Sequence, residues 1–238
     1  MGAPSDAVGD MGNTLVDGME ARKHAAAALA DLASLPKNGE QIILQGAVAQ
    51  LVKLLAEGDA NSKQFAAAAI ARLSEGREHS KKVKANKKPD KNASADELQA
   101  EAEKEAAMDT AMESMSSAIM PLVSMLDGKF GDAAQEEAAG ALFALAGNVN
   151  NRKAITEAGG IGPLVTMLGS DNPTTQKHAK GVLVRLSIES ENRALIIKKL
   201  VDMLSDQGSS AASAQEQAAA AIANLASEST DNRASIVD

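Results

Sequence analysis

A chain of 238 residues with 45% apolar residues is long enough to bury a hydrophobic core, but only 1% of its residues are aromatic. A β-sandwich or barrel needs aromatic and β-branched strands, so this composition excludes them in favour of helices packed through alanine and leucine. The net charge of −8 argues against a nucleic-acid-binding protein, and the absence of cysteine excludes disulfides and thiolate metal sites.

The N-terminal residues carry no targeting signal that the sequence reveals. Residues 1–18 are polar and lack the basic and apolar regions of a secretory signal. No apolar run approaches the ~20 residues that cross a membrane. We therefore expect a polar N-terminal segment on a soluble, cytoplasmic protein, with a nuclear location as the alternative.

Two short strings recur along the rest of the chain. The first reads LVKLL, LVSML, LVTML and LVDML, and its apolar spacing marks one face of a helix. The second reads AAAALADLA (25–33) and returns as AAAAIARLS, AAGALFALA, AKGVLVRLS and AAAAIANLA. Its last leucines are Leu32, Leu73, Leu145, Leu186 and Leu225, which are 41, 72, 41 and 39 residues apart. A unit of about 40 residues therefore repeats, with one longer interval.

A third signal follows most of these leucines by six or seven residues. It is an asparagine in four units and His79 in the second unit; the asparagines are Asn38, Asn151, Asn192 and Asn232. Because asparagine is a good N-cap, each position predicts the start of a short helix. A full unit is then a short helix, a turn, a second helix, a loop and a longer third helix.

The glycines of EAGGIGP lie at the first turn of the third unit. A glycine of this stretch is predicted to end the short helix in a position free to take a positive φ, and Pro163 to start the next helix. A phosphate-binding loop is the alternative, but the preceding strand and the ordered G-x-G-x-x-G are absent. Unit one makes the same turn with QGAVAQ. In unit four Leu200 follows Asn192 by only eight positions, so its two short helices are expected to merge or to meet at a tighter angle.

The long interval contains an insertion. Residues 81–95 are lysine-rich and are predicted to form a solvated linker between repeats at 19–80 and 96–238, with a nuclear-import signal as the alternative. Ser94 and Glu97 then form a capping box that starts an inserted helix, which replaces or extends the first helix of its repeat. Its apolar stripe of Met108, Met112, Met115 and Ile119 is expected in the core rather than on a partner.

These signals resemble the armadillo repeat, the module of β-catenin and importin-α. The matching residues are the Asn-Arg pair, AGGIGPLVTML and AAGALFALA, and the resemblance covers residues 19–80 and 115–238. It implies an all-α, right-handed α-solenoid of about five armadillo-type three-helix repeats, one interrupted by the insertion. HEAT repeats have a similar length but usually lack the signals that divide each repeat into three helices. We expect one continuous solenoid that is part of a longer array.

The resemblance also implies where a ligand binds, because the third helices of armadillo arrays line a concave groove. The groove positions that hold asparagine in importin-α-like proteins hold Asp31, Arg72, Ala144, Arg185 and Asn224 here. The tryptophan positions hold Ala27, Ala68, Gly140, Gly181 and Ala220, which argues against import-signal recognition. Arg72 and Arg185 are candidates to pair with carboxylates of an acidic partner, or else solvated arginines. His24 and His178 occupy equivalent groove positions and are interpreted as repeat consensus, not metal ligands.

No catalytic motif is found, so we expect no enzyme, cofactor or metal. The resulting hypothesis is a protein-protein interaction module, an adaptor or scaffold that binds an extended peptide or a protein in the groove. One alternative is a structural subunit of a large assembly, held by its convex face and ends. A second is the substrate-binding segment of a larger multidomain protein such as a ubiquitin ligase.

Overall fold

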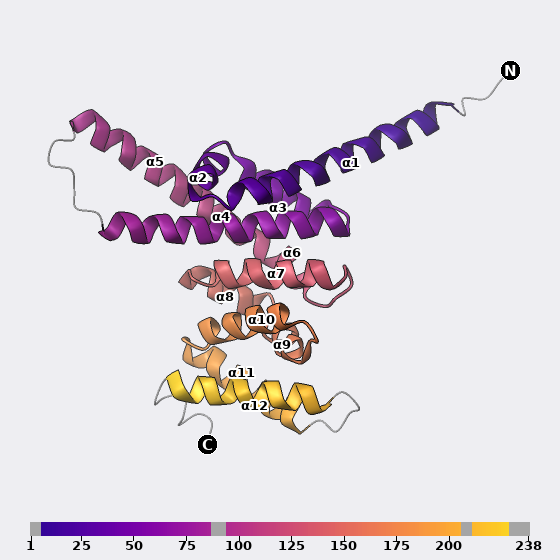
Figure 1. The fold of residues 1–238 in the computed structure, drawn as a ribbon, viewed down its shortest axis with the longest axis vertical. Coiled ribbons are helices and arrows are strands. Elements are labelled where there is room, and N and C mark those ends of the chain that lie inside the picture. Colours follow the sequence, from indigo (N-terminus) through magenta and orange to yellow (C-terminus); the bar gives the residue numbers. More distant parts are fainter. Residues whose placement is uncertain (1–5, 87–93, 206–210, 229–238) are drawn as a thin grey trace. The chain divides into compact units, whose positions relative to one another are not determined.

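The computed structural model describes residues 6–86, 94–205 and 211–228, and these form helices joined by short turns, with no strand among them (Figure 1). The all-helical fold predicted from composition and spacing is thereby confirmed. The chain divides into two compact units, Met1–Ser114 (unit 1) and Met115–Asp238 (unit 2). None of the described helices combines the length and apolarity needed to cross a bilayer.

Unit 1 is built around a long alanine-rich helix. Its helices are α1 (Asp6–Ala33), α2 (Pro36–Leu44), α3 (Ala47–Glu57), α4 (Ala60–Asn86) and α5 (Ala95–Ser114). Helices α1, α2 and α3 pack on α4, and α5 packs on α2 and α3. Residues 66–70 of α4 are buried, since small side chains let the neighbouring helices approach closely. The expected polar segment at 1–18 is helical from Asp6 onward.

Unit 2 alternates shorter helical segments with longer helices. Its elements are η1 (Met115–Ala118), α6 (Ile119–Met125), α7 (Asp132–Leu145), α8 (Val149–Glu157), α9 (Ile161–Thr166), η2 (Met167–Gly169), α10 (Pro173–Leu186), α11 (Ser190–Leu204) and α12 (Ala211–Glu228). The long helix α7 packs on α10, and α11 packs on α12 (Figure 1). Helix α11 is continuous from Ser190 to Leu204, which confirms that the two short helices merge in this unit.

The glycine cluster forms a turn between two helices, as predicted. Gly159 follows α8 with φ 77°, and Gly46 takes φ 76° between α2 and α3. Both values lie in the left-handed region that favours glycine. A Cβ on Gly160 would lie 2.9 Å from Cγ2 of Ile155, so this glycine permits a close approach. Pro163 is the third residue of α9, so the prediction that it starts the helix is wrong.

The repeated asparagines are not N-caps, which corrects the prediction for Asn38, Asn151 and Asn192. The N-cap positions of α2, α8 and α11 are held by Leu35, Asn148 and Glu189. Asn151 and Asn192 are buried inside their helices, where their side chains donate to the carbonyls of Leu145 (3.0 Å) and Leu186 (3.2 Å). Asn232 lies outside the described residues.

The following arginines assist the same contact. Arg152 donates to the carbonyls of Ala146 and Gly147 (both 3.3 Å), and Arg193 donates to Ser187 (3.2 Å). A helix leaves its last carbonyls without partners, so the Asn-Arg pair satisfies the C-terminal end of the preceding third helix. The motif therefore joins one repeat to the next.

The insertion is more ordered than the sequence indicated. Helix α4 continues to Asn86, so the linker predicted at 81–95 begins too early, and His79 lies inside α4 instead of starting a short helix. Residues 87–93 lie outside the described part. The capping box is confirmed, because Glu97 N donates to Ser94 Oγ (3.2 Å) and Ser94 N donates to Glu97 Oε2 (2.8 Å).

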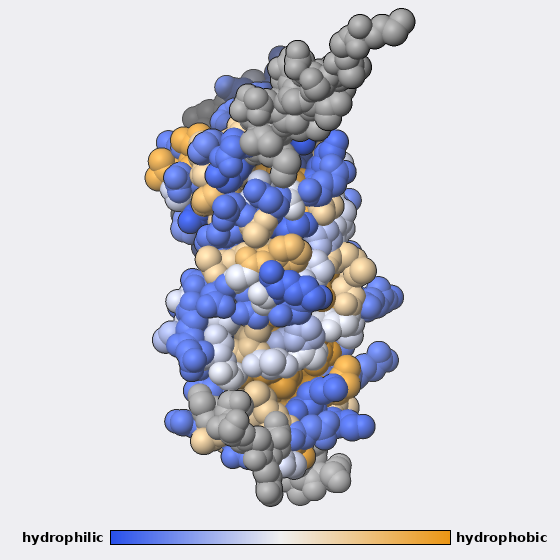
Figure 2. Space-filling view, turned by 90° about the vertical axis from the view of Figure 1, so that its right-hand side faces the viewer, coloured by the Kyte–Doolittle hydropathy of each residue, from blue (hydrophilic) through white to orange (hydrophobic). Residues whose placement is uncertain are grey.

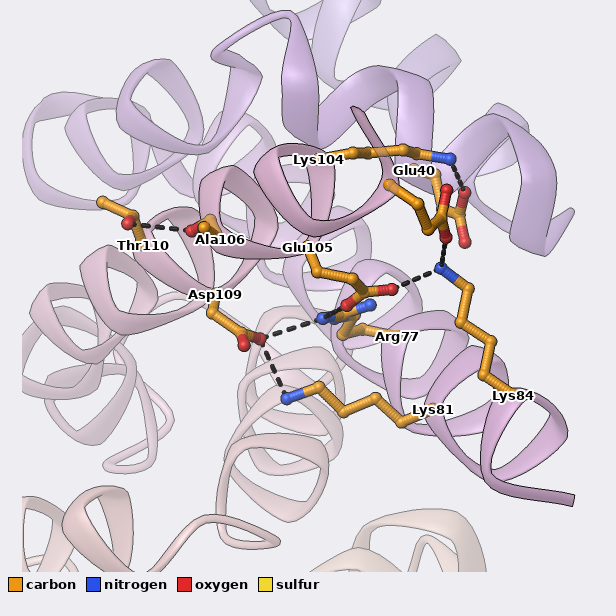
Figure 3. A network of polar contacts seen from close by, with 10 residues as sticks. Glu40, Arg77, Lys81, Lys84, Lys104, Glu105, Ala106, Asp109 and Thr110 are labelled. Atoms are coloured by element: carbon orange, nitrogen blue, oxygen red, sulfur yellow. Dashed lines mark hydrogen bonds and ion pairs between the residues drawn. The ribbon is translucent and has the colours of Figure 1, made fainter. Parts of the chain in front are cut away.

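Ion pairs join α5 to α4 and α2, as Figure 3 shows. Arg77 contacts Glu105 and lies 2.9 Å from Asp109, while Lys81 also lies 2.9 Å from Asp109. Lys84 contacts Glu105, which thereby has two cationic neighbours. The lysines predicted to be solvated are thus partly engaged by acidic residues of the inserted helix.

The methionine stripe belongs mainly to the core. Met108 is buried in unit 1, and Met115 and Ile119 are buried in unit 2, while Met112 is half-buried. The interpretation of the stripe as core is confirmed for the three buried residues.

Candidate protein-binding surface

In unit 1 the predicted groove residues lie on α1 and α4. Asp31 and His24 are exposed, and Arg72 is half-buried. Arg72 lines an open pocket of about 380 Å³ that also contains Ala33, Ser34 and His79. The carbonyl of Asp31 accepts the hydroxyl of Ser34 (2.6 Å), which closes the end of α1 beside this pocket. Unit 1 therefore presents one arginine at the rim of a small depression.

In unit 2 the predicted residues Arg185 and His178 both contact Phe143, a residue of α7 that the sequence did not single out. The guanidinium carbon of Arg185 lies 3.8 Å from the centre of the Phe143 ring, and Arg185 Nη1 donates to the Phe143 carbonyl. The imidazole ring of His178 stacks on the Phe143 ring, with ring centroids 6.2 Å apart and ring planes inclined by 19°. We call these three residues the Phe143 cluster.

Two glycines make room for the cluster. A Cβ on Gly181 would lie 2.6 Å from Cε2 of Phe143, and a Cβ on Gly140 would lie 3.2 Å from Cε1 of His178. These are two of the positions where the resemblance implied tryptophan. In this chain glycine is needed there because the rings of the neighbouring helix occupy the space.

Contacts along their length hold α7 and α10 together. Near their beginnings Asn172 donates to Oε2 of Glu136 (2.6 Å), and near their ends Arg185 reaches the Phe143 carbonyl. The ring stacking lies between these contacts. A surface held at several points loses little conformational freedom when a ligand binds.

The remaining predicted residues contribute less. Ala144 is only 7% exposed, so it offers little surface to a ligand. The side chain of Asn224 in α12 lies outside the described residues. Arg185 departs from the interpretation as a solvated arginine, because it is half-buried on an aromatic ring. Arg72 lies in unit 1 and Arg185 lies in unit 2.

The exposed surface mixes charged and apolar residues. Figure 2 shows hydrophilic residues across the visible face with smaller apolar patches between them. The large apolar side chains most exposed in the described regions include Met120, Ile188, Leu35 and Leu98. Within the described ranges, no group of three or more His, Asp or Glu residues is placed to hold a metal ion.

Two features of this surface were missed from the sequence. Phe143 is one of three phenylalanines and the one within the repeated third-helix string, a signal that could have drawn attention to it. A polar residue that recurs ten positions before the last leucine of each third-helix string was also missed. These residues are Arg22, Lys63, Gln135, Gln176 and Gln215. They could have been found by aligning the repeats on that leucine.

Comparison with known proteins supports the fold and the repeat. The protein-family model of the armadillo/beta-catenin-like repeat matches residues 148–188, which contain α8, α9 and α10. A stretch of 55 residues, 23% of the chain, is 53% identical to U-box domain-containing protein 12 of Oryza sativa subsp. japonica. The match spans 9% of that protein.

Solved structures are similar over most of the chain. Two crystal structures of engineered proteins match 92% of it, with 30% and 26% identity, TM-scores of 0.63 and 0.61, and coverage of 79% and 80% of those chains. A computationally designed armadillo repeat protein for modular peptide recognition matches 90% of this chain and 79% of its own, at 23% identity and TM-score 0.59. That likeness shows the fold alone. The chain belongs to the armadillo-repeat family, and its fold is an all-α armadillo-type solenoid.

Proposed function

We propose that the chain is a non-catalytic protein-interaction module, an adaptor or scaffold that binds an extended peptide or a protein on its third-helix face. The Phe143 cluster carries this proposal. It offers an aromatic ring, an imidazole and a guanidinium together on two helices that are held in place. Aromatic and arginine side chains of this kind are frequent among the residues that dominate binding energy at interfaces.

The chemistry of the cluster supports a partner with acidic side chains. A guanidinium has five donors in a planar fork that matches a carboxylate. Arg185 donates one hydrogen bond from Nη1 to the Phe143 carbonyl. Its ring contact restrains the side chain before binding, which reduces the entropy lost on association. In unit 1, Arg72 beside its pocket supports the same preference.

The fold offers further support. Similar folds occur in designed armadillo repeat proteins, one of which was solved in complex with a peptide, (KR)4. That peptide is basic, whereas the arginines of this chain favour the opposite charge. The fold supports an extended mode of binding, and the side chains decide which peptide is bound.

The proposal is tested by affinity purification from native extract with mass spectrometry. We compare the unaltered chain, the double variant Arg72→Glu plus Arg185→Glu, and the control Lys198→Glu, an exposed charge reversal on α11. The double variant is expected to lose partners that the control retains. Circular dichroism melting of each variant checks that the fold persists. If the double variant keeps every partner, binding on the third-helix face is excluded.

A second candidate is the substrate-binding segment of a larger protein such as a ubiquitin ligase. The local likeness to a rice U-box domain-containing protein favours it. In this role the partners are degradation substrates, so their recovery on the chain is expected to rise when the proteasome is inhibited in the extract. Equal recovery with and without the inhibitor would count against this candidate.

A further inference from the structure

One polar contact recurs in every described repeat that has a second and a third helix. Ten residues before the last leucine of the third-helix string, a side chain donates to a carbonyl at the C-terminal end of the second helix of the same repeat. The donor and acceptor pairs are Lys63 to Ala56 (2.9 Å), Gln135 to Leu126 (2.6 Å), Gln176 to Ser170 (2.6 Å) and Gln215 to Leu204 (3.0 Å). This donor satisfies a carbonyl that the helix end leaves open.

The equivalent residue of α1 is Arg22, which is exposed. No described second helix precedes α1, so no acceptor of this kind is available to Arg22 within the described residues. Arg22 is thus a positively charged donor at the position from which the other repeats donate to the C-terminal, negative end of a helix. The site is therefore electrostatically suited to a helix C-terminus.

The apolar face beside Arg22 is also uncovered. Ala25 is exposed and Leu29 is half-buried. The side chain of Leu32 is 52% exposed. Their counterparts on α4, α7 and α10 are 0–2% exposed; they are Ala66, Ile70, Leu73, Ala138, Leu142, Leu145, Ala179, Leu183 and Leu186. The same stripe is thus buried on α4, α7 and α10, each of which follows a second helix.

In unit 2 a second helix packs on a long helix that carries this stripe. Helix α9 and η2 pack on α10, and α9 also contacts α11, the helix that contains the next second-helix segment. In unit 1 the corresponding space lies between α1 and α3. It is a cavity of about 320 Å³, bounded by Arg22, Ala25 and Leu29 on α1 and by Leu51 and Leu54 on α3. We call these five residues the α1 cradle.

We propose that the α1 cradle binds an amphipathic helix of a partner protein in the manner of an armadillo second helix. The apolar residues of that helix, spaced as in LVTML, fill the cavity over Ala25, Leu29 and Leu54. Its C-terminal carbonyls accept hydrogen bonds from Arg22. This interface is separate from the third-helix face, so the chain has two binding surfaces with different ligands, an extended acidic peptide and an amphipathic helix.

The test uses the chain's own second helix as a probe. A fluorescein-labelled, C-terminally amidated peptide of residues 160–170, stapled because short helices are marginal in water, is titrated with the full chain and followed by fluorescence anisotropy. Saturable binding is expected. A control peptide with Leu164→Asp and Leu168→Asp loses the apolar face and is not expected to bind.

Protein variants locate the binding site. Ala25→Glu and Leu29→Glu are expected to weaken binding at least about tenfold, since each puts a charge on the apolar floor. Arg22→Glu is expected to weaken it about fivefold, whereas Arg22→Gln keeps affinity within about twofold because glutamine makes this contact in three other repeats. The control Val201→Glu, exposed on α11, leaves affinity unchanged.

Three results would overturn the proposal. The first is an absence of saturable peptide binding up to about 1 mM of the chain, near the limit of useful affinity. The second is equal peptide binding by the unaltered chain and by the Ala25→Glu variant. The third is self-association of the chain that Ala25→Glu abolishes. The last result would assign the cradle to a second copy of the chain. Because Ala25 is exposed, its substitution is compatible with folding, and a melting curve verifies this.

Discussion

Single side chains hold the repeats of unit 2 together at points that recur along the chain. Asn151 and Asn192 each reach back to the end of the preceding third helix, and the arginine that follows each one extends the contact. Phe143 occupies a space that two glycines leave open between α7 and α10. The distances at Asn151 and at Gly181 predict how a substitution at each position changes the stability of the protein.

Replacement of Asn151 by alanine is expected to destabilise the protein by about 1–2 kcal/mol, because a buried hydrogen bond to the Leu145 carbonyl is lost. Urea denaturation followed by circular dichroism measures the free energy of unfolding. Asn150→Ala is the matched control, since Asn150 is the exposed neighbour in the same helix and should change stability little. Equal effects of the two substitutions would contradict this role for Asn151.

Gly181→Ala is expected to cost about 1–3 kcal/mol, because its Cβ would lie 2.6 Å from the Phe143 ring. Gly162→Ala is the control: this helical glycine has nothing within 4 Å of a Cβ, so alanine should be neutral or stabilising. Thermal melting of both variants gives the comparison. Adding Phe143→Ala to Gly181→Ala should relieve the clash, and a failure to reduce the penalty of Gly181→Ala would contradict the steric explanation.

At the scale of elements, the inserted helix α5 is held against α4 by charge. Arg77 has a side chain that is 1% exposed, and it contacts the carboxylates of Glu105 and Asp109. Hydrogen bonds from Arg77 and then Lys84 lower the pKa of Glu105 from its usual 4.5 to about 2. Hydrogen bonds from Arg77 and Lys81 likewise lower the pKa of Asp109. Removing the Glu105 carboxylate leaves the charge of the buried Arg77 side chain less well compensated.

These shifts predict a dependence of stability on pH. Because the pKa of Glu105 is lower in the folded state, its contribution is present above about pH 4.5 and is lost as the pH falls toward 2. Urea unfolding of the unaltered chain and of Glu105→Gln at pH 7, 5, 4 and 3 measures it. The variant should be less stable at pH 7, and the difference should shrink toward pH 3. A difference that is constant with pH would contradict the ion pair.

At the scale of the whole molecule, stability comes from stacking one helical repeat on the next. A single triplet exposes its apolar faces, and neighbouring triplets bury them, as in other repeat proteins. The chain nevertheless forms two compact units that meet between Ser114 and Met115 in the sequence. Each unit has its own buried residues, for example Leu73 in unit 1 and Leu142 in unit 2.

A fragment of residues 115–238 is therefore expected to fold by itself. Its circular dichroism spectrum should be that of a helical protein, and urea should unfold it in one cooperative transition. A fragment with Leu142→Ala is the control, and its transition should lie at a lower urea concentration, since this change costs about 2–5 kcal/mol in a core. A gradual loss of signal in the unaltered fragment would show that unit 2 depends on unit 1.

Much of the fold was predictable because local rules suffice for it. The repeated leucines, the positive φ at Gly159 and the merged helix α11 follow from spacing, glycine chemistry and loop length. The role of Asn151 was predicted wrongly, because an asparagine side chain near a helix start can cap its own helix or a neighbouring one. The lysines after residue 80 looked solvated since their acidic partners are distant in sequence.

The linear order of residues is enough to define helices, turns and the armadillo repeat, since these depend on neighbours within a few positions. Which side chains meet across helices depends on packing, and there the three-dimensional structure was required. It brought Phe143 into contact with both His178 and Arg185, and it left Arg22 beside an open cavity. The Phe143 cluster and the α1 cradle each join residues of different helices, and such contacts form only when those helices pack on one another.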